Sequence, residues 1–83
     1  MANTTIRVLQ DGQPIEGVRV LVGSVVGEVL KSDSNGEVTF DLEKPWEGYV
    51  DVLMETEEST ATAAVHLVYG NTHEVVFTPA PIP

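Results

Sequence analysis

The sequence predicts an all-β protein, an antiparallel Greek-key β-sandwich of about seven strands that forms one domain over residues 1–78. Three observations carry this prediction. Apolar and polar residues alternate with a period of two, as in strands that bury one face. Gly, Asn, Asp and Pro interrupt the alternation at intervals of roughly 8–12 residues, which is typical of a sandwich. No stretch of helical length repeats its apolar residues with a period of 3.6.

The first half of the chain contains four stretches of alternation. Asp11-Gly12 supplies the first turn, because both residue types are common in tight turns. Asn35-Gly36 predicts a tight hairpin turn, since both residue types tolerate positive φ. Gly27 weakens the third stretch and indicates a bulge or an edge strand. The four predicted strands are Thr5–Gln10, Val18–Val22, Val25–Ser32 and Glu37–Leu42.

The second half continues the alternation in three stretches. Alanines in the middle stretch would suit a helix, but β-branched residues such as Thr62 and Val65 and the period of two favour a strand. Gly70-Asn71 predicts a turn before the last strand. The tail 79–83 is rich in proline, which cannot donate to a ladder, so we expect an extended linker or a strap on a neighbouring surface. The three predicted strands are Tyr49–Thr56, Thr60–Tyr69 and His73–Thr78.

Charge and composition narrow the classes of partner. The 83 residues include 13 acidic and 4 basic ones, and the net charge of −9 disfavours nucleic acid and anionic lipid as partners. No apolar run approaches the roughly 18 residues of a membrane span, and there is no cysteine for a disulfide or a zinc-thiolate site. The first five residues lack the basic and apolar regions of a signal peptide, so we expect synthesis in the cytoplasm. We expect the final location to be a virion or an extracellular assembly.

The first half of the chain resembles the carboxypeptidase regulatory-like domains. Residues 11–20, DGQPIEGVRV, are similar to the opening of that family, in which a turn precedes the pattern G-x-P-hydrophobic-x-G-V-x-V. Residues 32–40, SDSNGEVTF, resemble the hairpin pattern T-D-x-x-G-x-hydrophobic-x-F of the same family. The resemblance implies a transthyretin-like sandwich, close to the immunoglobulin-like ones. It also implies an accessory, adhesive or assembly role rather than catalysis.

Two specialised relatives of these domains can be compared with the chain. The adhesin B-type repeats look similar, but their Lys–Asn isopeptide bond needs a lysine in the first strand. Here the only basic residue of that strand is Arg7, whose guanidinium cannot form the bond. The hydroxyisourate hydrolases share the transthyretin fold and end in a Tyr-Arg-Gly-Ser motif, whereas residues 78–83 read TPAPIP. The resemblance therefore implies a member that is not an enzyme and has no cofactor.

Two groups of residues could bind a metal. Asp33, Asn35 and Glu37 place oxygen-bearing side chains at alternate positions around a glycine, as calcium sites do. The loop is shorter than a calcium loop of about 12 residues, and the same residue types build turns, so we interpret them as turn residues with calcium as the alternative. His66 and His73 could approach to about 5 Å across the last hairpin. No third ligand accompanies them, so we predict no metal site.

The sequence predicts a non-catalytic structural or assembly protein. We expect a small sandwich subunit that self-associates or docks on a larger protein array, such as a virion decoration protein or a filament subunit. The alternative is a carbohydrate-binding or spacer module of a larger extracellular protein. Trp46 has three interpretations: a cap on the core, an anchor for a protein contact or, with Tyr49, an aromatic platform for a sugar. The candidate interface residues are Val25, Val26, Val29, Trp46, Tyr49 and Ile82.

Overall fold

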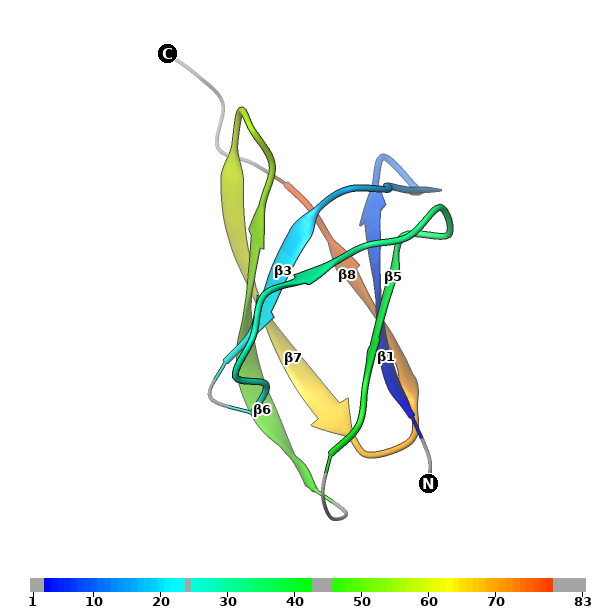
Figure 1. Cartoon of the computed structure of the whole chain (residues 1–83), viewed down its shortest axis with the longest axis vertical. Helices are drawn as coiled ribbons and strands as arrows, with labels where there is room; N and C mark the ends of the chain where they lie inside the picture. Colours follow the sequence, from blue (N-terminus) through cyan, green and yellow to red (C-terminus); the bar gives the residue numbers. More distant parts are fainter. Residues whose placement is uncertain (1–2, 24, 43–45, 79–83) are drawn as a thin grey trace.

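The computed structural model describes residues 3–23, 25–42 and 46–78, which form strands and no helix (Figure 1). The prediction of an all-β protein is therefore confirmed over these residues. None of the described segments is a helix that could cross a membrane. The strands are β1 (Thr4–Gln10), β2 (Gln13–Pro14), β3 (Arg19–Val22), β4 (Leu30–Lys31), β5 (Glu37–Phe40), β6 (Glu47–Glu55), β7 (Thr60–Val68) and β8 (Thr72–Val76).

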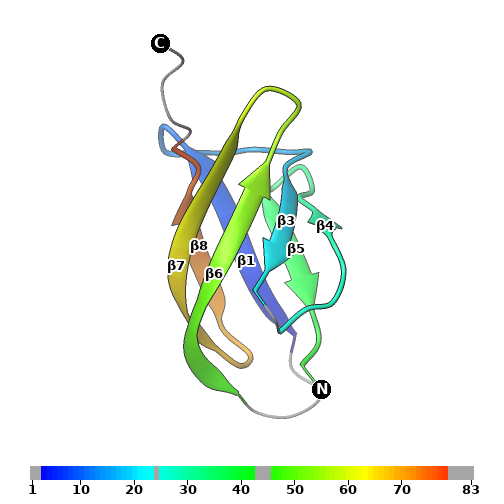
Figure 2. The same ribbon diagram turned by 90° about the vertical axis from the view of Figure 1, so that its left-hand side faces the viewer.

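The strands form two four-stranded sheets that face each other (Figure 2). In the first sheet, β8 pairs with one edge of β1, and β5 and β2 pair with successive halves of the other edge. In the second sheet the order is β4-β3-β6-β7, and every pair is antiparallel. Each of the seven predicted segments contains a strand, and β2 is an additional short one.

One strand pair differs from the predicted antiparallel arrangement. Strand β8 runs parallel to β1, with residues 72–76 opposite residues 5–9. The reason is that β7 pairs with β6 in the second sheet, so the Gly70-Asn71 turn carries the chain across to the first sheet. The expectation that His66 and His73 face each other across a hairpin is therefore wrong, because their strands do not pair.

The predicted strand over residues 25–32 is mostly a loop. Only Leu30–Lys31 pair with β3, as β4. The N–H groups of Val25 and Val26 both donate to the carbonyl of Val22 at 3.2 Å, which turns the chain away from the sheet. The expected edge strand at this place is therefore a loop that runs beside the sheet.

The turn at Asn35-Gly36 joins the two sheets and does not close a hairpin, because β4 and β5 lie in different sheets. Of these two residues only Gly36 has positive φ, at 74°. The Asp33 carboxylate accepts the N–H groups of Asn35 and Glu37, each at 2.9 Å, and so fixes the turn. The Gly36 carbonyl in turn accepts the N–H of Val8 at 2.7 Å.

One apolar core lies between the two sheets. Its members follow the period-two alternation, so the inward faces of the strands are those that the sequence predicts. Burial of each such side chain contributes about 1.5–3 kcal/mol, which makes this core the main source of stability in a chain without disulfides. The fully buried apolar residues are Ile6, Val8, Val18, Val20, Val22, Val52, Met54 and Leu67.

The buried hydroxyl of Ser32, the residue after β4, bonds the loop before β3. Ser32 Oγ accepts the N–H of Val18 at 2.9 Å and donates to the carbonyl of Ile15 at 2.7 Å. Ser32 is 3% exposed, so water cannot replace these two bonds. This contact holds the chain where it passes from the first sheet to the second.

We predict that Gly36→Ala destabilises the fold far more than Gly12→Ala. Both glycines have φ near +75°, which costs an alanine about 1–2 kcal/mol. A Cβ at Gly36 would also lie 2.7 Å from the Val8 carbonyl oxygen, whereas nothing lies within 4 Å of a Cβ at Gly12. Urea unfolding should give a loss of about 2–5 kcal/mol for Gly36→Ala. Equal losses of unfolding free energy in the two variants would show that a Cβ at Gly36 does not crowd β1.

We predict that Ser32→Ala lowers the free energy of unfolding by about 1–3 kcal/mol, because the Val18 N–H loses its buried acceptor. The control is Ser34→Ala, in which the exposed hydroxyl of the adjacent turn is removed. Its effect should stay within about 0.5 kcal/mol. Thermal and urea unfolding measure both. A Ser32→Ala protein as stable as the parent would contradict the prediction.

Candidate functional site

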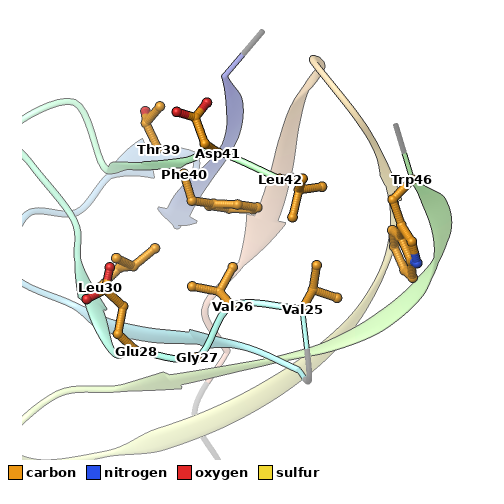
Figure 3. Close-up of a pocket in the computed structure, with 10 residues that line it drawn as sticks. All are labelled: Val25, Val26, Gly27, Glu28, Leu30, Thr39, Phe40, Asp41, Leu42 and Trp46. Carbon is orange, nitrogen blue, oxygen red and sulfur yellow. The ribbon is translucent and has the colours of Figure 1, made fainter. Parts of the chain in front are cut away.

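The main concave surface of the described residues is a groove on the side of the molecule where β4 and β5 lie (Figure 3). One wall is the loop 25–30, the other is the strand end 39–42, and Trp46 lies at one end. The groove has a volume of about 840 Å³. Its lining consists of Val25, Val26, Gly27, Glu28, Leu30, Thr39, Phe40, Asp41, Leu42 and Trp46.

Apolar side chains meet in this groove. Figure 3 shows Phe40 and Leu42 directed toward Val25 and Val26 across the space between the walls. The two valines are half-buried, and Leu30 beside them is also half-buried. The cause is the short β4: two paired residues cannot cover this side of the core, and the loop that replaces the strand covers it incompletely.

The rim of the groove is acidic. Glu28 and Asp41, one on each wall, are both exposed, and among the described residues no lysine or arginine lines the groove. An acidic rim around apolar lining side chains suits a partner segment that is apolar and carries a basic residue. The period-two alternation places Phe40 and Leu42 on the apolar face of a strand and does not predict that they line a groove. Their place in a groove depends on the loop opposite, which was predicted as a strand.

Trp46 is half-buried and packs against the core at the end of the groove. A Cβ placed on Gly48 would lie 3.0 Å from the indole Cη2 atom, so the ring lies directly over this glycine. Gly48 is two residues along and shares its face of the strand. Of the three interpretations of Trp46, the contacts match the cap on the core, and the groove leaves part of the ring accessible.

Tyr49 lies on the opposite face of β6, where it is 79% exposed. Its ring stacks on that of His66, with centroids 5.0 Å apart and an interplanar angle of 26°. The interpretation of Trp46 and Tyr49 as one aromatic platform is therefore wrong, because residues three apart on a strand face opposite ways. His66 Nε2 also lies 3.0 Å from Glu47 Oε2. These three side chains form a cluster on the outer face of the second sheet.

The candidate calcium ligands do not converge. The Asp33 carboxylate caps the turn, and the Glu37 carboxylate points to Arg7, with 2.6 Å between Oε2 and Nη2. The hydrogen bond that Arg7 donates to the Glu37 carboxylate raises the pKa of the guanidinium above its usual value, and Glu74 adds to this. Over residues 3–23, 25–42 and 46–78 no three acidic or histidine side chains group as metal ligands. The interpretation as turn residues fits these bonds.

The remaining predicted interface residues lie apart from the groove. Val29 is 60% exposed and lies beside Leu53, which is 40% exposed, and Leu21 on the outer face of the second sheet. The sequence predicts Val29 on an edge strand and does not predict its place beside Leu53. Ile82 lies outside the described residues. The groove therefore collects three of the six predicted interface residues: Val25, Val26 and Trp46.

Comparison with known proteins adds no relative. No protein-family model matches the chain, and a search of curated proteins returns no match. The geometry of the described residues is thus the basis for assigning a function.

We predict that Trp46→Ala lowers the free energy of unfolding by about 2–3 kcal/mol, because the half-buried ring covers the end of the core. Tyr49→Ala is the matched control, an aromatic truncation on the same strand and the opposite face. It should cost less than about 1 kcal/mol, since the Tyr49 ring is largely exposed. Urea unfolding followed by circular dichroism measures both variants. A larger loss from Tyr49→Ala would overturn this assignment.

Proposed function

We propose that this protein is a non-catalytic structural subunit that docks on a larger protein array. The observation that carries the proposal is the groove, because the apolar side chains that line it are only partly covered. Partly exposed apolar side chains gathered in a concave surface are a common feature of protein interaction sites. Trp46 adds an aromatic residue of the type that anchors such contacts.

The acidic rim indicates the chemistry of the partner. We infer an apolar segment that carries a lysine or arginine near Glu28 or Asp41. Each apolar side chain that enters the groove would contribute about 1.5–3 kcal/mol. Each exposed ion pair at the rim would add about 0–1 kcal/mol and would weaken with added salt. Most of the affinity would come from the apolar side chains that line the groove, and the acidic rim would select the partner.

The proposal also covers the type of sandwich and the kind of assembly in which the subunit would work. We infer a Greek-key, transthyretin-like sandwich of the carboxypeptidase regulatory-like type. Support comes from the motif residues, since Asp11-Gly12 closes the turn between β1 and β2 and Gly17 has φ of 85°. The second motif, residues 32–40, joins the two sheets. A virion surface or a filament would suit such a subunit, and both offer repeated partner surfaces.

We predict that peptides selected from a displayed library on the full chain share an apolar centre with a flanking lysine or arginine. Val26→Asp, which places a charge among the apolar side chains that line the groove, should weaken binding of a selected peptide at least tenfold, or about 1.4 kcal/mol. Val76→Asp is the control, because this valine is 59% exposed on β8 and lies outside the groove. Fluorescence of Trp46, the single tryptophan, reports occupancy directly.

Two results would count against docking through the groove. One is a selected peptide whose affinity is unchanged by Val26→Asp. The other is binding to a glycan array that Trp46→Ala abolishes, which would favour the carbohydrate-binding alternative instead. Circular dichroism of each variant separates a lost contact from a lost fold.

A further inference from the structure

The outer edge of β7 has no paired strand among the described residues. Strand β7 pairs with β6 along all nine of its positions and lies at the margin of the second sheet (Figure 2). Tyr69 donates its N–H to the Trp46 carbonyl at 3.0 Å. Because hydrogen-bonded pairs alternate along an antiparallel ladder, the backbone groups of Ala61, Ala63, Val65 and Leu67 also point toward β6. The residues between them direct their N–H and C=O groups away from β6. These residues are Thr60, Thr62, Ala64, His66 and Val68.

The far end of this edge is already occupied. The Val68 N–H donates to His73 Nε2 at 2.9 Å, and the Val68 carbonyl accepts the N–H of Asn71 at 3.1 Å. Both bonds lie on the side away from β6, which agrees with the alternation. The stretch open to another strand therefore runs from Thr60 to His66.

Strand β7 carries none of the features that usually protect an edge. It has no Asp, Glu, Lys, Arg, Pro or Gly, and its register with β6 has no bulge. The other three edges are protected. Strand β4 has two residues, β8 carries Glu74, and the Glu37 N–H and carbonyl at the start of β5 are bonded by Asp33. The longest edge of an acidic protein is thus also its uncharged one.

We propose that β7 pairs with β7 of a second copy in the antiparallel sense, which joins two four-stranded sheets into one. The proposal deepens the proposed function, on which it rests, by naming one partner and the surface it uses. A two-fold axis at Ala63 places Thr60 opposite His66 and Thr62 opposite Ala64 of the other copy. The four residues whose backbone groups point away from β6 then exchange hydrogen bonds with the other copy. The edge is therefore complementary to itself.

Charge permits this contact in spite of the net charge of −9. Glu47, Asp51 and Glu55 lie on the neighbouring strand β6, and Glu57 and Glu58 lie before Thr60, outside the stretch that would pair. The two β6 strands would be three strand spacings apart, about 14 Å. This exceeds the Debye length of about 8 Å at physiological ionic strength, so repulsion between them is largely screened. Added salt should favour the pairing, whereas it should weaken ionic contacts at the groove rim.

Side-chain size also suits a close approach. Ala61 and Ala63 face inward on β7, yet both are only half-buried, because the core is open along this edge. In the proposed register, Ala63 of the second copy would cover Ala63, and Val65 of the second copy would cover Ala61. On the outer face Thr62 would meet Ala64 of the other copy, which brings no charge or bulky side chain into contact.

Sedimentation velocity of the full chain over a concentration series tests the proposal. We expect a monomer–dimer equilibrium whose dissociation constant rises at least tenfold in Thr62→Lys. Val76→Lys is the control, since it adds the same charge at an exposed strand residue of the first sheet, outside the groove, and it should leave the dimer intact. Ala64→Pro, which removes an outward N–H that bonds no residue of β6, should also dissolve the dimer.

Cysteine cross-linking tests the register. The chain has no cysteine of its own. Ala63→Cys places two thiols at the axis in a non-hydrogen-bonded pair, where Cα atoms approach to about 4.5 Å and a disulfide can form. Ala61→Cys is the control, since its two copies would be about 14 Å apart. Oxidation should give a covalent dimer of the first variant and not of the second.

A chain that stays monomeric would overturn the pairing but leave peptide binding in the groove, and hence the proposed function, standing. A dimer that persists in both Thr62→Lys and Ala64→Pro would also overturn it, since another surface would then be responsible. If the β7 dimer forms but no peptide binds in the groove, the proposed docking through the groove is rejected instead.

Discussion

Strand β1 holds the first sheet together, because every other strand of that sheet bonds to it. On one edge β8 pairs in parallel, and on the other β5 and β2 divide the length of the strand between them. The two halves meet at Val8, whose N–H bonds Gly36 and whose carbonyl bonds Ile15. Above the sheet, Arg7 contacts both Glu37 on β5 and Glu74 on β8. The order of the first sheet therefore depends on the hydrogen bonds of one strand.

The two sheets share one core but do not close around it. On the side of β4 and β5 the second sheet ends in a two-residue strand, and the groove opens there. On the other side β7 ends the second sheet and leaves Ala61 and Ala63 half-buried. A domain of this size exposes a large share of its surface in any case. Among the described residues, the core is only partly covered at these two places, where a partner could extend it.

The two open sides differ in chemistry and would be used differently. The groove offers apolar side chains behind an acidic rim, so under the proposed function it would select a partner by shape and charge. The edge of β7 offers backbone groups and no charge, so it suits an identical strand. A subunit with one self-complementary edge and one selective groove can pair with itself and attach the pair to something else. This combination is what an assembly protein requires.

The alternation of residues by itself determined the all-β class, the approximate position of the strands and the inward face of each, because burial of one face imposes a period of two. Pairing partners were decided only by tertiary structure. The parallel pair of β1 and β8, the loop at residues 25–29 and the separation of His66 from His73 all follow from which sheet each strand joins. Local sequence carries no information on that choice, since it depends on hydrogen bonds between residues far apart in the chain. The groove and the open edge of β7 exist for the same reason.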